Sequence, residues 1–338
     1  MIGKNIILGI ETSCDDTAAA VLKDGHKVLS NIVATQEELH ESFGGIVPEV
    51  ASRKHIELIN IVIKQALKRA NVDFKDLTAV GVTNGPGLIG SLLIGLAAAK
   101  AICYSLNIPL IGVNHVLSHM YANFIENPDI KRPIVSLVAS GGHTSIYLLK
   151  ENDEFEILGS TLDDAAGEVL DKIARFLNIG YPGGPAIERI SINRNADAYK
   201  LPRPMLEKGL NFSFSGLKTA VIYMVRKDKT LLSRKNIPDL AASFQKAVID
   251  VLVKKTLRAA LSYEVPTITL AGGVSSNSYL RSEMKKRAES YGVDAIYPPK
   301  EYCTDNAAMV ACLAYYKLKK GQISNIDIDA YSQISLKT

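Results

Sequence analysis

The predicted fold rests on the stretch Asn5-Ile6-Ile7-Leu8-Gly9-Ile10, which runs into Glu11-Thr12-Ser13-Cys14-Asp15-Asp16-Thr17. The first six residues are mostly isoleucine and leucine, a composition typical of a buried strand. The next seven form a polar turn, and two further strands are predicted at Ala18–Leu22 and Lys27–Ala34. The chain therefore opens with a β-hairpin whose turn is small and polar.

The same order of elements returns near residue 134. An apolar strand is predicted at Ile134–Ala139, a glycine-bearing polar turn at Ser140–Thr144, and two strands at Ser145–Leu149 and Glu154–Leu158. This repetition of composition and order indicates a weak internal duplication. Two α/β halves of this kind suggest two lobes with a nucleotide cleft between them, the arrangement of the actin-like, Hsp70-like and sugar-kinase-like (ASKHA) ATPases.

The remaining sequence completes these two lobes. We expect the first lobe at residues 1–114 with a C-terminal helix at about 304–338, and the second at residues 115–303 with helical insertions. Helical periodicity at Ala51–Ala70 places Ile56, Ile59, Ile63 and Leu67 on one side. Further strands are predicted at Leu77–Val82, Leu110–Val113, Thr267–Leu270 and Ala295–Tyr297. Further helices are predicted up to Leu106 and at Ala165–Leu177, Pro185–Ile192, Ser215–Arg226, Pro238–Leu261, Ser278–Tyr291 and Thr304–Lys319.

Composition excludes several classes of protein. The chain has 338 residues, is 47% hydrophobic and carries a net charge of +4, which is typical of a globular protein and permits a polyanionic partner. The four cysteines form no C-x-x-C pair, so neither a zinc knuckle nor a disulfide framework is indicated, and free thiols fit the cytosol. The N-terminus has no secretory pattern, and the apolar run Leu88–Ala99 is interrupted by glycines. We therefore expect a cytoplasmic protein without a membrane span.

Two histidines at helical spacing stand between the two similar segments. His115 and His119 are four residues apart, which puts both imidazoles on one face of a helix, where they can bind one divalent metal. A packed or solvated pair is the alternative. Asp305 is the candidate for an oxygen ligand, although a carboxylate in Thr304-Asp305-Asn306 can instead cap the last helix.

Glycine-bearing turns offer backbone amides to a ligand. Ser140-Gly141-Gly142 can hold a phosphate or a developing oxyanion, or can be an ordinary hairpin turn. Gly272-Gly273 lets a flat base approach the backbone, with Asn277 at its edge, unless these glycines serve only strand-to-helix packing. Gly184 is another position where a ligand can approach closely. Lys172 and Lys218 are candidates for phosphate contacts, or solvated lysines.

Motif absences and basic clusters narrow the chemistry. No Gly-x-Ser-x-Gly elbow, P-loop or His-Glu-x-x-His occurs, and Val116 stands where a metallopeptidase has its glutamate. Basic residues cluster at Arg226–Lys229, Arg234-Lys235, Lys285–Arg287 and Lys317–Lys320. Each cluster is explained by a solvated helix end, but together they can also follow a nucleic-acid backbone.

The chain resembles the bacterial TsaD family, the transferase subunit that makes N6-threonylcarbamoyladenosine in tRNA, formerly called O-sialoglycoprotein endopeptidase. The resemblance runs nearly end to end. It is carried by Gly9–Asp15, Gly44–Glu49, Gly85–Leu88, Ser140–Thr144, Asp163–Glu168, Tyr181–Pro185, Phe212–Lys218, Ala271–Val274 with Asn277, and Cys303–Asn306.

The resemblance implies a metal-centred site with one divalent metal per subunit, iron (Fe²⁺) being favoured and zinc an alternative. It implies the metal ligands His115, His119 and Asp305. It implies substrate contacts from Val138, Ala139, Ser140, Gly141, Gly142, Asp171, Gly184, Glu188 and Asn277. No separate general base is assigned, and Glu11 is the candidate. The family often has Glu-Gly where this chain has Leu117-Ser118, which changes the surroundings of the second ligand.

The implied reaction is an acyl transfer. The exocyclic amine of adenosine 37, in tRNAs that read codons beginning with A, attacks the carbamoyl carbon of threonylcarbamoyl-AMP, and AMP leaves. Such a reaction needs positioning and charge stabilisation more than a strong nucleophile. We expect the metal to act as a Lewis acid on the threonylcarbamoyl group. The resemblance also implies two protein partners, a paralogous TsaB subunit and the TsaE ATPase.

Two rival functions remain open from the sequence. An ATP-dependent phosphotransferase of the same fold would use Mg²⁺ and a carboxylate base, for which Glu11 and Asp15 are candidates. A non-enzymatic scaffold would bind tRNA or protein and keep only a vestigial nucleotide site. Transfer of phosphate from labelled ATP to sugars or acids would identify the phosphotransferase. The scaffold predicts that Asp305→Ala leaves tRNA modification intact.

Overall fold

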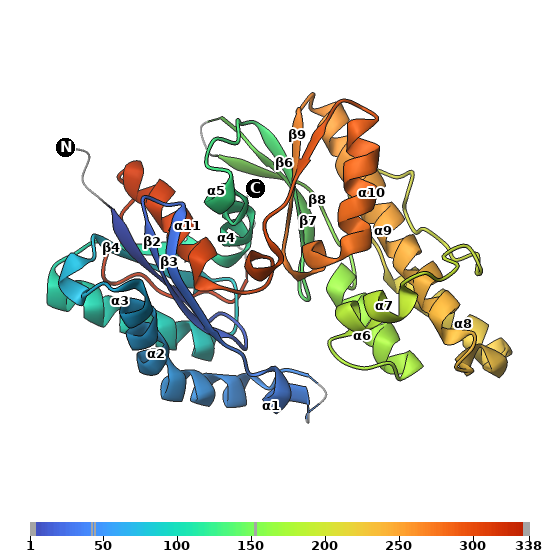
Figure 1. The fold of residues 1–338 in the computed structure, drawn as a ribbon, viewed down its shortest axis with the longest axis horizontal. Coiled ribbons are helices and arrows are strands. Elements are labelled where there is room, and N and C mark those ends of the chain that lie inside the picture. Colours follow the sequence, from blue (N-terminus) through green and yellow to red (C-terminus); the bar gives the residue numbers. More distant parts are fainter. Residues whose placement is uncertain (1–4, 42, 44, 152–153, 334–338) are drawn as a thin grey trace. The chain divides into compact units, whose positions relative to one another are not determined.

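The opening stretch of the chain folds into a strand, a polar turn and an antiparallel partner, as predicted (Figure 1). This is seen in a computed structural model that describes residues 5–41, 43, 45–151 and 154–333. Gly44, from the Gly44–Glu49 segment, lies outside the described residues. Strand β1 (Ile6–Glu11) pairs with β2 (Thr17–Lys23), and β2 pairs with β3 (Lys27–Ala34). Pairing of Glu11 with Ala18 leaves the polar residues between them as the turn.

Two parallel strands complete the first sheet. Strand β4 (Ala79–Gly85) lies beside β1, and β5 (Leu110–Asn114) lies beside β4, giving the order β3-β2-β1-β4-β5. The carboxyl ends of parallel strands meet at one edge of a sheet, where open α/β sheets usually bind ligands. Glu11, Gly85 and Asn114 end the three parallel strands at that edge.

Helices cover both faces of this sheet. Figure 1 shows α2 (Pro48–Ala70) and α3 (Ile89–Leu106) on one face and α11 (Ala307–Lys319) on the other. Helix α11 packs so closely on β1 that a Cβ at Gly9 would overlap the backbone of Ala307 and Ala311. Shorter helices are α1 (Glu37–Glu41), η1 (Phe74–Asp76), α4 (His115–Tyr121) and α5 (Asn123–Glu126).

The predicted buried side of α2 is wrong at one position. Ile59, Ile63 and Leu67 are buried, but Ile56 is 64% exposed and His55 takes the buried place beside it. The His55 imidazole bonds Thr17 Oγ1 at 2.7 Å and the Cys14 carbonyl at 3.0 Å. A buried histidine with two polar partners thus aligns the helix, while isoleucine is left on its outer face.

The second sheet repeats the topology of the first. Its order is β10-β9-β6-β7-β8, with β6 (Ile134–Ala139), β7 (Thr144–Leu149) and β8 (Phe155–Ser160) antiparallel and β9 (Thr267–Ala271) and β10 (Asp294–Ile296) parallel. Replacing β6–β10 by β1–β5 gives the order of the first sheet. The internal duplication inferred from composition is therefore present in the strand topology.

Helices between β8 and β9 form the apolar core around this sheet. They are α6 (Ala166–Leu177), α7 (Gly183–Ser191), α8 (Ser215–Lys227), η2 (Lys229–Leu232) and α9 (Ile237–Ser262). After β9 follow η3 (Gly273–Ser276), α10 (Ser278–Glu289) and η4 (Lys300–Tyr302). Helix α9 is buried along most of its length, so the sheet and the helical segments share one core.

Contacts within the chain define two compact units. The first comprises the described residues up to Ile130 and from Asp305 onward, and the second comprises Lys131–Thr304. Helix α4 and Asp305 both belong to the first unit, although nearly two hundred residues separate them in sequence. The predicted ligand set therefore lies within a single unit.

Helix α3 is long and apolar enough to cross a membrane by length and composition alone. Its residues Leu92, Leu96 and Cys103 are buried within the first unit, where α3 packs on β4 and α2. This packing is that of a helix on the face of a globular sheet. The outer side of α3 remains apolar and exposed at Ile89 and Leu93.

Candidate functional site

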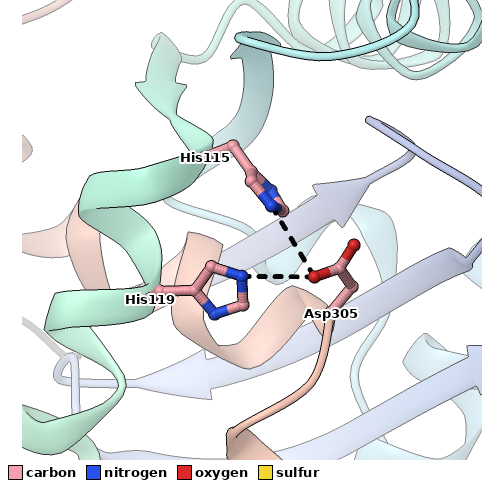
Figure 2. A group of neighbouring side chains, drawn as sticks. All are labelled: His115, His119 and Asp305. Atoms are coloured by element: carbon pink, nitrogen blue, oxygen red, sulfur yellow. Dashed lines mark ion pairs between the residues drawn. The ribbon is translucent and has the colours of Figure 1, made fainter. Parts of the chain in front are cut away.

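Helix α4 carries both histidines of the predicted metal site. It begins where β5 ends, because Asn114 caps it: the side-chain oxygen of Asn114 accepts a hydrogen bond from Leu117 N at 3.0 Å. His115 and His119 lie one turn apart and point the same way (Figure 2). Their ring centroids are 4.7 Å apart with planes at 80°. The spacing in the sequence thus places the two imidazoles side by side, as predicted.

Asp305 meets these histidines from the far end of the chain. Its Oδ1 lies 3.2 Å from His119 Nε2 and 3.6 Å from His115 Nε2 (Figure 2). The alternative role of Asp305, capping α11, belongs to its neighbour: the Asn306 side chain accepts the hydrogen bond from Met309 N. The Asp305 carboxylate is therefore directed to the histidine pair rather than to the helix.

The geometry of these three side chains fits a divalent metal. Their ligand atoms all lie within 4.8 Å of one another. Bonds of about 2.1 Å in a tetrahedral site place ligand atoms roughly 3.4 Å apart, which agrees with the distances of 3.6 and 3.2 Å from Asp305 Oδ1 to His115 Nε2 and His119 Nε2. Both ring nitrogens of His119 are buried without a hydrogen-bond partner among the described residues, which is costly unless something else binds there. A cation between the three groups would satisfy the nitrogen that faces Asp305.

Glu11 contacts the His115 ring at Nδ1, the nitrogen that does not face Asp305. Its Oε2 lies 3.1 Å from His115 Nδ1 and accepts a hydrogen bond of 2.6 Å from Thr83 Oγ1, while its Oε1 accepts one of 2.6 Å from Ser13 N. Ser13 Oγ also lies 3.0 Å from His115 Nδ1. This carboxylate–histidine arrangement orients a ligand ring and leaves Nε2 for the metal. Both Glu11 oxygens thus have partners, and its role as a general base stays a prediction.

The carboxylates of Asp305 and Glu11 favour a positive charge at the His115 ring. Burial by itself lowers the pKa of the His115 imidazole, but Asp305 and Glu11 more than reverse this and raise the pKa to about 9. Burial would raise the pKa of the Glu11 carboxyl, but the His115 charge and hydrogen bond hold it below the ordinary value. The two carboxylates thus favour a positive charge here, which a proton or a metal ion can supply.

Sequence reasoning missed how Glu11, Thr83 and Asn114 are brought together. All three lie at or near the carboxyl ends of the parallel strands β1, β4 and β5. A polar residue in that position on each of three parallel strands was the available signal. The second contact that was missed comes from the C-terminal segment, where the Tyr331 hydroxyl accepts a hydrogen bond of 3.0 Å from Asn114 Nδ2.

The predicted substrate-binding residues gather in the second unit. Val138 and Ala139 end β6, and Ser140, Gly141 and Gly142 form the turn into β7. The Ser140 carbonyl accepts a hydrogen bond of 3.1 Å from Gly167 N in α6. Gly272, with φ of +83°, lies so close to Ala139 that a Cβ would overlap its carbonyl. The ends of β6 and β9 and the start of α6 therefore meet, and the space beside Gly141 and Gly142 is open.

The remaining predicted residues in this unit have structural partners as well. Asp171 Oδ1 accepts a hydrogen bond of 2.7 Å from Gly183 N, next to Gly184. Glu188 Oε1 accepts one of 2.9 Å from Ser278 N, next to Asn277. Asn277 caps α10 through Leu280 N at 3.0 Å and donates to Gln245 at 2.9 Å. Both ends of the Asn277 amide are therefore occupied, so its base contact stays a prediction.

The acidic start of α6 is joined to the Phe212–Lys218 segment. Asp163 accepts hydrogen bonds of 2.6 Å from both Ser213 Oγ and Ser215 Oγ. Lys172 and Lys218 reach Asp164 at 2.7 and 2.5 Å. Two motifs about fifty residues apart are thus one polar cluster, and both lysines that were candidates for phosphate contacts have a carboxylate partner.

Comparison with solved structures identifies the fold class. The chain superimposes on the (R)-2-hydroxyglutaryl-CoA dehydratase component A of Acidaminococcus fermentans with a TM-score of 0.58, at 16% identity over 93% of this chain and 99% of the other. A ROK family glucokinase from Streptomyces griseus gives a TM-score of 0.51 at 12% identity, covering 93% of this chain and 100% of the other. With its duplicated sheets, the protein has the ASKHA-type α/β fold that the sequence predicted.

Comparison of sequences then identifies the family. The family model TsaD, tRNA N6-adenosine threonylcarbamoyltransferase, matches residues 27–312. Curated proteins of that name are 51% identical in Caldicellulosiruptor saccharolyticus, over 98% of both chains, and 50% identical in Thermosipho africanus, over 98% of this chain and all of the other. The chain belongs to the tRNA N6-adenosine threonylcarbamoyltransferase (TsaD) family, which confirms the resemblance drawn from its motifs.

Proposed function

We propose that this protein transfers the threonylcarbamoyl group from threonylcarbamoyl-AMP to N6 of adenosine 37 in tRNAs that read codons beginning with A, releasing AMP. The observation that carries the proposal is the convergence of His115, His119 and Asp305 within 4.8 Å in a chain of this family. A His₂-carboxylate set leaves coordination places open, which is typical of catalytic rather than structural metal sites.

The metal site is enclosed by the two histidines and open to solvent at Asp305. Glu11 orients the His115 ring, and the buried His119 ring closes one side. The side chain of Asp305 is 22% exposed, against 9% and 2% for the two histidines, so the open side is at the carboxylate. A bound divalent metal would supply Lewis-acid polarisation of the acyl oxygen. The His₂-carboxylate set suits Fe²⁺ and Zn²⁺, and we propose iron as the native metal.

We assign the donor's nucleotide part to the second unit. The backbone amides of Ser140, Gly141 and Gly142 would face its phosphate, and Gly184, Gly273 and Asn277 would lie along the adenosine. The open space beside Gly141 and Gly142 supports this assignment. Acyl transfer to an amine from a mixed anhydride depends on such positioning more than on a strong base. This agrees with Glu11 being engaged in the support of His115.

We also propose TsaB and TsaE as partners, and the cytoplasm as the location. The outer faces of α2 and α3 support a protein partner, because they expose large apolar side chains that would otherwise face water. These side chains are Ile56, Ile61, Ile89, Leu93 and Tyr104. The four cysteines are free thiols, which fits a reducing compartment.

The test is transfer in a reconstituted reaction. Unmodified tRNA is incubated with threonylcarbamoyl-AMP, the protein and both partners, with or without a chelator, and the nucleosides are analysed by mass. We expect N6-threonylcarbamoyladenosine to form, to disappear when the metal is removed, and to require the partners. His115→Ala should lower bound metal and transfer together, while His26→Ala, an exposed histidine outside the site, should change neither. Full transfer and full metal content in His115→Ala would overturn the proposal.

A further inference from the structure

A corner of the second unit carries an unusual density of unpartnered positive charge. The corner is defined here as Arg226–Lys235, which joins the end of α8 through η2 to the start of α9. We propose that this corner binds the phosphate backbone of tRNA while its adenosine is modified. The inference rests on the proposed function, because it names the surface that docks the macromolecular substrate.

The charge of the corner is not neutralised by the protein. Five of its ten residues are cations, namely Arg226, Lys227, Lys229, Arg234 and Lys235, and all five are exposed. None of them has an ion pair or a side-chain hydrogen bond among the described residues. The single acid, Asp228, accepts hydrogen bonds from Thr230 N and Thr230 Oγ1. Cations that the protein leaves unpaired are available to an external polyanion.

The other two basic clusters noted in the sequence have partners within the protein. Arg287 pairs with Asp250 at 2.7 Å and with Glu283 at 2.9 Å, and Lys285 pairs with Glu289 at 3.9 Å. Lys317 donates to the Gly112 carbonyl at 2.6 Å. Of the four clusters seen in the sequence, the two that form the corner are thus those in which no cation has an ion pair or a side-chain hydrogen bond among the described residues.

Helix stability explains only part of the corner. Arg226 and Lys227 lie in the last turn of α8, where cations are favourable. Arg234 and Lys235 precede the first residue of α9, at the positive end of that helix, where cations are unfavourable. A charge placed against the helix dipole requires another reason, and an anionic partner supplies one.

The corner is held in shape and has an aromatic side chain beside it. Leu231 of η2 is buried, and Asn236 Nδ2 donates a hydrogen bond to the Thr230 carbonyl at 3.1 Å. Tyr223 is 65% exposed and lies three and four residues before Arg226 and Lys227, on the same face of α8. Cations beside an exposed aromatic ring suit an RNA strand, whose bases stack on such rings.

The test compares two charge-matched variants. One replaces Arg226, Lys227, Arg234 and Lys235 by Gln, and the control replaces by Gln four exposed cations of the first unit that lie outside α2 and α3, namely Lys27, Lys75, Lys319 and Lys320. Binding of unmodified tRNA is measured by fluorescence anisotropy at several salt concentrations, with the partners present. We expect the corner variant to bind about tenfold more weakly, and its salt slope to fall by about three. Its KM for tRNA should rise with kcat kept, and the control should behave as wild type.

The outcomes separate this inference from the proposed function. Equal Kd and salt slope in wild type and corner variant would overturn the docking surface and leave the transferase function standing. Equal losses in both variants would show nonspecific attraction and would also overturn it. If wild type binds tRNA through the corner but transfers nothing, the proposed reaction fails and the surface stands. If wild type binds no tRNA, both fail.

Discussion

Asp305 and Asn306 are adjacent in the chain and perform different tasks. Asn306 caps α11, and Asp305 reaches the two histidines. Either side chain has the right chemistry for a helix cap, so the sequence left both roles open for Asp305. The structure distinguishes them because only the residue directly before the first helical turn can accept from the Met309 amide.

We therefore expect the two alanine variants to have separate effects. Asn306→Ala should reduce the free energy of unfolding by about 1 kcal/mol, since one amide at the helix start loses its acceptor. Asp305→Ala should lower metal affinity strongly, and in metal-free protein it should cost stability only below about pH 9, where Asp305 pairs with protonated His115. Denaturant unfolding and metal titration of both variants measure the two effects. The same loss of stability in both variants above that pH would show that Asp305 also supports the helix.

At the scale of elements, α4 is the helix that the ligands depend on. Its first turn is fixed by Asn114, whose two amide ends have different partners: Oδ1 accepts from Leu117 N and Nδ2 donates to the Tyr331 hydroxyl. The Tyr331 contact thereby selects the amide orientation that caps the helix. A tyrosine more than two hundred residues away thus helps to place His115.

Tyr331→Phe tests this coupling. Loss of the hydroxyl removes the acceptor of Asn114 Nδ2 and frees the amide to rotate, so we expect about tenfold weaker metal binding, as for groups that orient ligands. Ser324→Ala is the matched control, because Ser324 also fastens the C-terminal segment, through its hydroxyl to Gly112 N, but does not touch Asn114. Metal titration by calorimetry measures both variants, and equal affinities would contradict the positioning role.

Local patterns in the sequence were informative where the cause is local. The spacing of His115 and His119 predicts their proximity because both lie on one helix turn, and the hairpins follow from strand composition. The burial of α2 was misjudged because apolar residues occur on both sides of this helix, and the partners that bury His55 come from another segment. The supports of His115 could not be predicted for the same reason: Glu11 lies 104 residues away in sequence.

At the scale of the whole molecule, the duplication has given two sheets of equal topology with different residues at the ends of their strands. The parallel strands of the first sheet end at a cluster of imidazoles and carboxylates, whereas β6 and β9 of the second sheet end at glycine-bearing turns. All three predicted ligands fall in the first unit. Metal binding should therefore act on one half of the protein.

We expect the metal to stabilise the first unit selectively. At a free metal concentration one hundred times Kd, binding adds about 2.7 kcal/mol to the stability of the unit that holds the ligands. Hydrogen exchange with and without metal should show slower exchange in β1, β4, β5 and α4, and little change in β6–β10. His119→Ala should show no difference between the two conditions. Equal protection across both units would contradict a site contained in the first.

The C-terminal segment has one further consequence. Ser324 N donates a hydrogen bond to the Leu110 carbonyl at 2.9 Å. Residues after α11 therefore cover part of the free edge of β5, an edge strand of the first sheet. An uncovered edge strand has unpaired backbone groups and can pair with a strand of another molecule. A chain shortened ahead of Ser324 should consequently self-associate into aggregates, and an affinity tag is better fused to the other terminus.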